Sequence, residues 1–415
     1  MTCQKYCARS RVFDSICFLC RVKVLILHQH FNTPQSGGPL RSYYLAKALV
    51  DRGIAVSIIT ARRQTFYSQE TVEGIDVHYL PIAYDNKFGF YKRGISFLRY
   101  AIDCVKITGR IRGITLCYAI SVPLTVGQAA LWIRKKYSTP FIFEVGDLWP
   151  DAPVQLGFIQ NHVLQRALYW LEKRIYFNAK QVVALSEPIR DAIVSKVPGT
   201  VVKVIPNISD VQFFHPEEKD PALEKEFGVT GKYVVSYIGA VGFANGLDYY
   251  LECARASQKA GLNVHFLMCG EGGAFEGLKN AAKRLGLSNF TFVPFTNREG
   301  VRKLLNVTDA TFISYRPFKI LETGSPNKYF DGLAAGKLIV TNFGGWIREE
   351  IIRENCGLAL DSKFPHDFVN QISPLLNDHS REAAMRVNAR NLAVRKYSRE
   401  LLSNEFARMI QDTIL

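Results

Sequence analysis

A segment in the second half of the chain combines two carboxylates, a lysine and a predicted helix start. It reads ETGSPNKYFDGLAAGKLIVTNFGGW and spans residues 322–346. Its pattern predicts a helix over about 327–335 that stops at Gly336, followed by an apolar strand over 338–341. A helix that follows a polar turn presents free backbone N–H groups and a positive dipole end. The segment therefore predicts a binding site for an anion such as a diphosphate.

Four side chains of this segment suit that chemistry. Pro326 lies near the first turn, where its missing N–H costs little, and Lys328 adds a full positive charge. Glu322 and Asp331 would flank the anion and accept hydrogen bonds from hydroxyl groups. The alternative is an ordinary helix-strand unit whose charges are only solvated.

The elements that must position this site alternate regularly between strand and helix. Each predicted strand is an almost continuous apolar run, which is typical of parallel sheets covered by helices on both faces. We therefore predict an α/β protein with two tandem doubly wound parallel-sheet (Rossmann-like) domains. The strands are expected at residues 22–27, 56–60, 115–119, 141–145, 181–185 and 201–205, and then at 233–238, 264–269, 290–293, 310–315 and 338–341.

The alternation also predicts the domain boundaries. It begins after an extension of residues 1–21 and is lost around two prolines and the charged run 217–220. A terminal helix over about 400–414 can close either domain. The expected divisions are a first domain over 22–208, a linker over 209–231, a second domain over 232–395, and a C-terminal helix over 396–415 that can cross back to the first domain.

Positive charge is concentrated in the first half of the chain. The formal net charge is +15, and residues 1–208 carry 27 basic against 13 acidic residues, whereas residues 209–415 carry 25 against 24. We expect the first half to meet an anionic partner. Arg9, Arg11 and Asp14 interrupt every apolar run at the start, so no secretory leader is expected there.

One uncharged stretch, residues 114–133, is long enough to suggest a membrane span. Ser121, Pro123, Gly127 and Gln128 interrupt it, which favours a strand, a turn and then a helix over about 125–136.

The nine cysteines fall into two groups. Cys3, Cys7, Cys17 and Cys20 lie in the extension, where C-x-x-C allows a zinc knuckle as an alternative to a loose segment. The other five are scattered, as expected for reduced, buried thiols of a cytosolic protein.

Ligands of open α/β sheets bind beyond the carboxyl ends of the strands, so the loops there are candidate sites. After the first strand, Gly37 and Gly38 allow close backbone approach to a ligand, although a glycine pair is more often only a turn. After residue 145, Asp147 can accept hydroxyl hydrogens while Trp149 covers an apolar sugar face. The alternative for Trp149 is a buried contact between the domains.

In the second half, glycines follow two predicted strands at Gly239, Gly242, Gly270 and Gly272. Neither loop completes G-x-G-x-x-G with a downstream acid, so a nicotinamide cofactor is poorly supported and no cofactor is expected. No Asp-x-Asp occurs in the chain. A diphosphate would therefore be neutralised by helix dipoles and Lys328, without a metal.

These motifs together resemble glycosyltransferase family 4, which has the GT-B architecture, and within it the fucosamine-transferase-like branch of bacterial surface-polysaccharide enzymes. The resemblance covers nearly everything from residue 22 onward. It rests on SGGPLRSYYLAKALVDRG, PLTVGQAALWIRKK, FEVGDLWPDAP, VIPNISDVQFF, YIGAVGFANGLDYYLECA, and SPNKYFDGLAAGK with NFGGW.

The resemblance implies a retaining transfer of a sugar from a nucleotide diphosphate, most readily a UDP-sugar, held by the second domain. It implies catalytic roles for Glu322 and Asp147, with Asp331 near the ribose. Ser325, Asn327 and Lys328 join the four glycines above as donor-binding residues, and Gly37, Gly38, Arg41 and Trp149 belong to the acceptor or phosphate loops.

The sequence departs from the family pattern at three places. The acids are spaced Glu-x8-Asp where the family has Glu-x7-Glu, which places the role of Glu322 in doubt. The family's basic pair for the diphosphate would fall near Ala240 and Asn245, which are neutral. The family's histidine before the first-domain acid is replaced by Gly146, which leaves Asp147 as the candidate polar group there.

The leading interpretation is a glycosyltransferase acting on a polyprenyl-linked or growing glycan, cytoplasmic and peripheral on the inner face of the membrane. A GT-B-type sugar-nucleotide epimerase and a basic nucleic-acid-binding protein are the alternatives, and nucleic acid is not expected as a partner because no recognised binding module is present. Cations interleaved with aromatics over residues 87–112, including Phe97 and Tyr100, predict contact with an anionic membrane surface.

Overall fold

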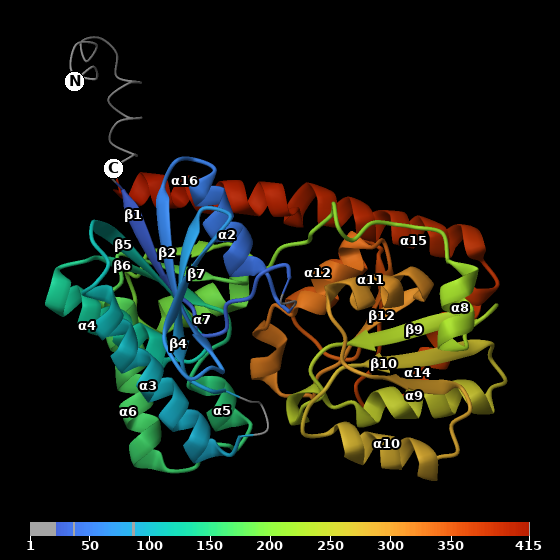
Figure 1. Ribbon diagram of the computed structural model, residues 1–415. Coiled ribbons are helices and arrows are strands. Elements are labelled where there is room, and N and C mark those ends of the chain that lie inside the picture. Colours follow the sequence, from blue (N-terminus) through green and yellow to red (C-terminus); the bar gives the residue numbers. More distant parts are fainter. Residues whose placement is uncertain (1–21, 36–37, 85–87, 415) are drawn as a thin grey trace, which may run out of the picture.

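The first domain is built on one twisted, mostly parallel sheet (Figure 1). The computed structural model describes residues 22–35, 38–84 and 88–414. Within them the sheet has eight strands in the order β3-β4-β2-β1-β5-β6-β7-β8, and only β3 runs antiparallel to its neighbour. The strands are β1 (Lys23–Leu27), β2 (Ala55–Arg62), β3 (Ser68–Val72), β4 (Ile75–Pro81), β5 (Ile114–Ile120), β6 (Phe141–Val145), β7 (Gln181–Ala184) and β8 (Val202–Val204).

Helices cover both faces of this sheet. One cluster of buried side chains lies between the sheet and α2, and another lies between the opposite face and α3, α4, α6 and α7. The helices of this domain are α2 (Arg41–Val50), α3 (Phe90–Thr108), α4 (Thr125–Tyr137), α5 (Asp151–Gln155), α6 (His162–Asn178) and α7 (Glu187–Lys196).

The second domain repeats the plan with a six-stranded, fully parallel sheet in the order β11-β10-β9-β12-β13-β14. Its strands are β9 (Tyr233–Ile238), β10 (Val264–Cys269), β11 (Phe290–Val293), β12 (Ala310–Ile313), β13 (Leu338–Thr341) and β14 (Gly357–Ala359). Its helices are α8 (Pro221–Phe227), α9 (Asp248–Lys259), α10 (Phe275–Arg284), α11 (Arg298–Val307), α12 (Asn327–Ala334), α13 (Trp346–Arg353), α14 (Asp367–Leu376) and α15 (His379–Leu392), with short turns η1 (Phe243–Asn245) and η2 (Lys319–Thr323). The predicted fold class is confirmed.

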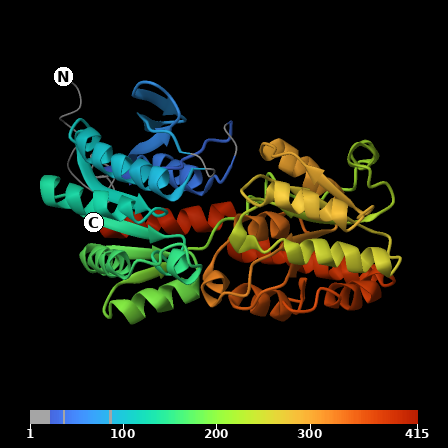
Figure 2. The ribbon, with the colours of Figure 1, turned by 90° about the horizontal axis from the view of Figure 1, so that it is seen from below.

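Two chain segments cross between the domains and bond to each other. Ser209 N–H donates to Tyr397 O at 2.7 Å, and Arg399 N–H donates to Ser209 O at 2.9 Å. After the π-helical turn η3 (Ala393–Tyr397), the last helix α16 (Arg399–Ile414) runs back along the first domain and packs against α2 (Figures 1 and 2). Phe406 of α16 meets Tyr118 of β5 edge to face, with ring centroids 4.9 Å apart.

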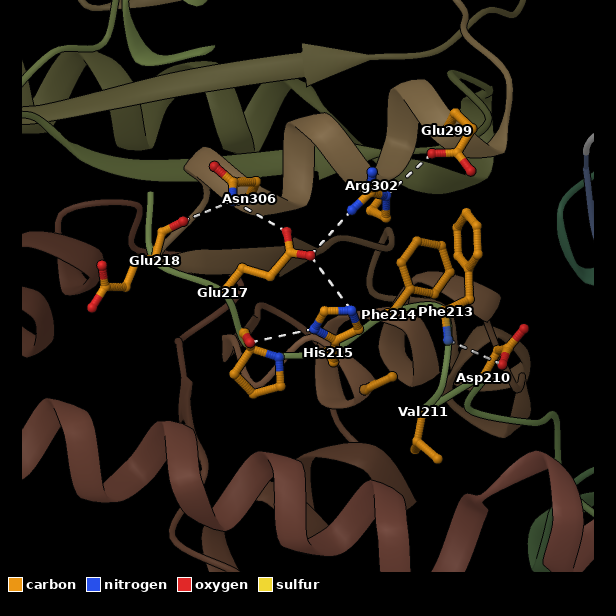
Figure 3. A network of polar contacts seen from close by, with 12 residues as sticks. Asp210, Val211, Phe213, Phe214, His215, Glu217, Glu218, Glu299, Arg302 and Asn306 are labelled. Atoms are coloured by element: carbon orange, nitrogen blue, oxygen red, sulfur yellow. Dashed lines mark hydrogen bonds and ion pairs between the residues drawn. The ribbon is translucent and has the colours of Figure 1, made fainter. Parts of the chain in front are cut away.

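The linker is held on the second domain by a polar network on α11 (Figure 3). Glu217 accepts hydrogen bonds from Arg302 at 3.1 Å and from Asn306 at 3.2 Å. The Asn306 amide also donates to the carbonyl of Glu218 at 2.9 Å. Because α11 is fixed in this way, the side chains at its N-terminus are directed to a defined place between the domains.

The structure also resolves the ambiguous segments of the sequence. The uncharged stretch 114–133 forms β5, a turn and most of α4. None of the helices in the described part of the chain is both long enough and apolar enough to cross a membrane. Five free cysteines, Cys104, Cys117, Cys253, Cys269 and Cys356, are buried, whereas the C-x-x-C of the extension lies outside the described residues.

Candidate functional site

The N-terminus of α12 opens into a cleft between the two domains. Pro326 occupies the N-cap position with an extended backbone and no side-chain cap hydrogen bond. Tyr329 N–H donates to Pro326 O at 3.0 Å, so the N–H groups of Asn327 and Lys328 are those left without an intrahelical acceptor. Lys328 lies in this first turn, where the positive end of the helix dipole disfavours a cation. An anion in the cleft would remove that conflict and satisfy the free N–H groups.

Lys328 lies beside the backbone of Gly239 and near two tyrosine rings. Its Nζ lies 4.9 Å from the ring centroid of Tyr237 and 5.9 Å from that of Tyr315. Burial lowers the pKa of Lys328 to about 8, and the nearby Asp331 acts in the opposite direction. The lysine is therefore poised between its charged and neutral forms near physiological pH.

Asp331 lies one turn further along α12, on the side of the cleft. Burial raises the pKa of Asp331 to about 7; Asp210 adds to the rise, while Arg298 and Lys328 oppose it. A carboxylate in such a place is suited to accept hydrogen bonds from ligand hydroxyl groups. Its elevated pKa marks a group placed for binding at an energetic cost.

Arg298 is a site residue that the sequence analysis missed. It is the first residue of α11, and its guanidinium forms an ion pair with Asp210 and lies 3.7 Å over the ring centroid of Phe213. Asp210 also accepts a hydrogen bond of 2.6 Å from the Tyr44 hydroxyl. Arg298 thus brings a second cation to a helix N-terminus beside the same cleft. Its position at a helix start was the available signal, because cations are disfavoured there.

The cleft has a volume of about 560 Å³ and brings together part of the predicted set. Seven predicted residues line it, from both domains: Gly38, Arg41, Gly239, Gly270, Asn327, Lys328 and Asp331. The predicted residues Glu322, Asp147, Trp149, Gly242, Gly272 and Ser325 are not among its lining residues. Gly37 lies outside the described residues.

Two of the glycines are required by the close crossing of two loops. A Cβ at Gly270 would stand 1.8 Å from the carbonyl oxygen of Gly239, and one at Gly272 would stand 2.3 Å from that of Val241. Both also have positive φ angles, 155° and 154°. These glycines shape the loops after β9 and β10, and Gly270 in addition lines the cleft.

Arg41 is engaged by the protein itself. Its guanidinium donates to both carboxylate oxygens of Glu144, pairs with it at 2.9 Å, and also donates to the carbonyls of Ile205 and Pro206. Arg41 is buried, so this network joins α2, β6 and the end of the first domain. Most of the Arg41 N–H groups therefore already have acceptors within the protein, although the residue also lines the cleft.

Asp147 and Glu322 lie at a second junction of the domains, beside η2. A Cβ at Gly324 would stand 4.0 Å from Asp147 Oδ1, and burial together with Asp147 raises the pKa of Tyr315 across this junction. Asp147 is exposed to solvent on one side, and desolvation by the surrounding protein raises the pKa of its carboxyl group. Glu322 pairs with Lys319 at 3.1 Å and packs against the backbone at Gly344.

The remaining predicted residues help to build this junction. Trp149 is partly buried and packs with the apolar cluster that contains Ile320 of η2, which favours the interdomain packing role. The Ser186 hydroxyl donates to the carbonyl of Thr323 at 2.7 Å. Ser325 has a buried hydroxyl with no hydrogen-bond partner within the described structure, directly before α12.

The side chains do not assemble a metal centre in the region that the structure describes. No group of three or more His, Cys, Asp or Glu residues is placed there to hold a metal ion. The positive groups at the cleft include the N-termini of α11 and α12, Lys328 and Arg298. Together with an acid suited to hydroxyl groups, they define a site for a polyhydroxylated phosphate ligand.

Comparison with known protein families identifies both domains. The glycosyl transferase 4-like domain family matches residues 36–208, and the glycosyl transferases group 1 family matches residues 219–392. The chain thus pairs a glycosyl transferase 4-like domain with a glycosyl transferases group 1 domain, in the two-domain GT-B fold. It is 21% identical over 243 residues to the alpha-D-kanosaminyltransferase of Streptomyces kanamyceticus, a match that covers 57% of this chain and 62% of that protein, somewhat less than two thirds of its length.

Solved structures share the fold over almost the whole chain. Sucrose-phosphate synthase from Thermosynechococcus elongatus superposes with a TM-score of 0.72 at 16% identity, covering 94% of this chain and 98% of that one. HepE from Anabaena, solved with UDP-glucose, has a TM-score of 0.69 at 17% identity, covering 94% and 99%. WaaG, a glycosyltransferase involved in lipopolysaccharide biosynthesis, has a TM-score of 0.66 at 13% identity, covering 94% and 99%.

Proposed function

We propose that this protein transfers a sugar, with retention of anomeric configuration, from a UDP-sugar to a lipid-linked or growing glycan in surface-polysaccharide synthesis. The observation that carries the proposal is the convergence of two helix N-termini on one interdomain cleft, each with a cation, Lys328 or Arg298, in its first turn. This arrangement suits the diphosphate of a nucleotide sugar. The UDP-glucose complex of HepE, which has the same fold, supports the donor class.

Residues of both domains contribute to the proposed transfer. Lys328 and the N–H groups of α12 stabilise the negative charge that grows on the diphosphate as its bond to the sugar C1 breaks. Asp331 accepts hydrogen bonds from the ribose hydroxyls. Asp147 approaches from the first domain, and its raised pKa suits a group that receives the acceptor hydroxyl proton as the new C1–O bond forms. Glu322 lies beside the donor sugar.

The subtype of donor sugar and acceptor is proposed from similarity. The kanosaminyltransferase relative and the quoted motifs favour an amino sugar or N-acetylamino sugar, as in the fucosamine-transferase-like branch. WaaG, in turn, supports an acceptor in bacterial surface-glycan assembly. We place the enzyme in the cytoplasm, at the inner face of the membrane where such acceptors lie.

The test is incubation with a panel of UDP- and other nucleotide sugars, each with and without a polyprenyl-diphosphate-sugar acceptor. We expect release of the nucleoside diphosphate that depends on acceptor, and a product whose new linkage keeps the donor's anomeric configuration by NMR. An isomerised nucleotide sugar formed without acceptor would instead identify an epimerase. Failure of every donor would refute glycosyl transfer.

A further inference from the structure

The outer side of α3 carries a line of exposed apolar residues next to a line of cations. Tyr91, Ile95, Leu98 and Ile102 are exposed by 86%, 67%, 51% and 40%, and their spacing of three and four residues places them on one helix face. Lys92, Arg99 and Lys106 follow the helix at intervals of two turns and are also exposed.

Two aromatics expected on this outer side belong to the interior. Tyr100 is fully buried and its hydroxyl donates to the carbonyl of Ile59 at 2.6 Å. Phe97 is half-buried and stacks on Tyr84, with ring centroids 5.5 Å apart. The segment 87–112 is therefore less aromatic on its outer side than its sequence indicates, and Lys87 lies outside the described residues.

The aromatic contribution comes from α6, which the sequence analysis did not single out. Val163, Trp170 and Phe177 are exposed by 76%, 59% and 79%. They are spaced by seven residues, or about two turns, so they form a straight line along the helix. The Arg174 guanidinium lies 5.0 Å over the Trp170 ring, beside this line.

The helix α4 joins these two lines into one surface. It contacts α3 on one side and α6 on the other, and all three cover the same face of the sheet, opposite α2 and α16 (Figure 1). Its exposed residues include Trp132, Lys135 and Lys136. We call the outward sides of α3, α4 and α6 the three-helix face.

Positive charge predominates on the three-helix face. The helices carry four, three and three basic residues, and all except the half-buried Arg93 are exposed. The two acids on them are Asp103, which pairs with Lys106 at 2.8 Å and with Arg99 at 3.7 Å, and Glu172, which is buried. The face thus offers exposed apolar groups among cations that far outnumber its acids.

We propose that the three-helix face docks on an anionic lipid bilayer; this rests on the proposed function in that it brings the enzyme to a lipid-linked acceptor. The apolar lines enter the boundary between headgroups and acyl chains, and the flanking Lys and Arg side chains reach the anionic headgroups. Tryptophan and tyrosine are well suited to that boundary because each combines an apolar ring with a polar group.

A bilayer fits this surface better than a second copy of the chain. A two-fold dimer through the three-helix face would place its cations against the same cations of the other copy. An anionic membrane instead supplies opposite charge over a broad, flat area. Each basic residue near such a surface contributes to the attraction independently of exact geometry.

The test measures sedimentation with phosphatidylglycerol vesicles and with phosphatidylcholine vesicles. We expect binding to the anionic vesicles alone. The variant K135Q/K136Q/K173Q/R174Q should reduce the partition coefficient by about a hundred- to a thousandfold. Because it leaves the apolar residues in place, a second variant, W170S/F177S, tests their share and should also release the protein from the vesicles.

Matched changes in the second domain serve as controls. Lys279 and Lys283 are exposed on α10, and Phe364 is 62% exposed. K279Q/K283Q and F364S should bind vesicles as the unchanged protein does. Equal binding to both vesicle types, or a three-helix variant that still binds, would overturn the proposal, as would a dimer that the same variants dissociate.

Vesicle binding and sugar transfer fail separately. The three-helix variants should retain donor-dependent transfer to a water-soluble acceptor analogue, because none of the changed residues lines the cleft. Loss of vesicle binding with intact transfer therefore supports the docking surface. Vesicle binding by a protein that uses no nucleotide sugar would instead refute the proposed function and leave the membrane surface intact.

Discussion

The end of the Lys328 side chain occupies the space beside Gly239 where any other residue would place its side chain. A Cβ built on Gly239 would stand 3.0 Å from Lys328 Cε and 3.4 Å from Nζ. Gly239 also has a φ of 148°, which L-residues rarely adopt. A glycine is therefore needed at position 239, after β9, to leave room for the side chain of the lysine at the start of α12.

This relationship predicts that Gly239→Ala displaces the lysine and strains the backbone. Strain of this kind costs about 1 to 3 kcal/mol, and we expect kcat/KM for the donor to fall by at least about tenfold because the Lys328 ammonium can no longer reach its place. Steady-state kinetics and thermal unfolding measure the two effects. Gly242→Ala is the control, because the nearest neighbour of its Cβ would be 3.5 Å away and the φ of Gly242 is ordinary. An equal loss of kcat/KM in both variants would contradict the steric relationship between Gly239 and Lys328.

Lys328 itself should carry a large share of donor recognition. Hydrogen bonds to a charged group contribute about 1.5 to 3 kcal/mol, so Lys328→Ala should lower kcat/KM by about ten- to a hundredfold without loss of the fold. Lys279→Ala, on the exposed side of α10, provides the matched control. Wild-type kinetics in the Lys328 variant would show that the diphosphate does not bind at α12.

Asp331 should make the fold less stable as the pH rises. Its pKa is raised from 3.8 to about 7, so protonation favours the folded state and this stability is lost between about pH 4 and pH 7. Asp331→Asn cannot ionise and should be more stable than the unchanged protein at pH 8. Since water reaches the cleft, we expect a gain on the order of 1 kcal/mol.

The measurement is denaturant unfolding of both proteins at pH 4 and at pH 8. The gain should disappear at the lower pH, and the variant should bind donor more weakly at the higher pH. A variant that is less stable at pH 8 would contradict the burial of this carboxylate as the cause of its raised pKa.

The pH dependence of donor use should be narrow. Ionised Asp331 is required to accept ribose hydroxyl groups, so kcat/KM should fall below about pH 7, and protonated Lys328 is required for the diphosphate, so it should fall above about pH 8. The profile of kcat/KM reports these groups in the free enzyme. An alkaline limb that persists unchanged in Lys328→Arg, whose guanidinium stays charged, would assign that limb to another group.

Activity should survive chelation. The chain contains no Asp-x-Asp, and the N–H groups of α12 with Lys328 already supply positive charge to a diphosphate. Assays in excess EDTA, compared with assays in added magnesium or manganese, measure this. Complete loss in EDTA that either metal restores would refute this account of the donor site.

Sequence reasoning predicted the local architecture closely. The helix expected over 327–335 is α12, Asn327–Ala334, and the strand expected over 338–341 is β13, Leu338–Thr341. Both depend on signals within a few residues, such as a proline at the helix start and a glycine at its end. The β3–β4 hairpin was not predicted, because β3 is a polar edge strand with little apolar pattern.

Interactions between distant segments account for most of what sequence reasoning missed. Nothing near Arg41 in the sequence indicates that Glu144 will engage it, since that contact joins segments more than a hundred residues apart. Arg298 likewise lies at the cleft because of the tertiary placement of α11, which packs into the core and also bonds to the linker. Residue types predicted a phosphate site, but the identity of its second cation depends on tertiary structure.

Because α16 returns to the first domain, complete folding of that domain depends on synthesis of the rest of the chain. The apolar core that Tyr118 shares with Phe406 is complete only after the whole second domain has been made. Domains commonly fold as units while the chain emerges from the ribosome, N-terminal domain first. Here one face of the first sheet stays incompletely covered until α16 has been made. Newly made chains therefore pass through a stage in which that face is accessible to chaperones and to premature association.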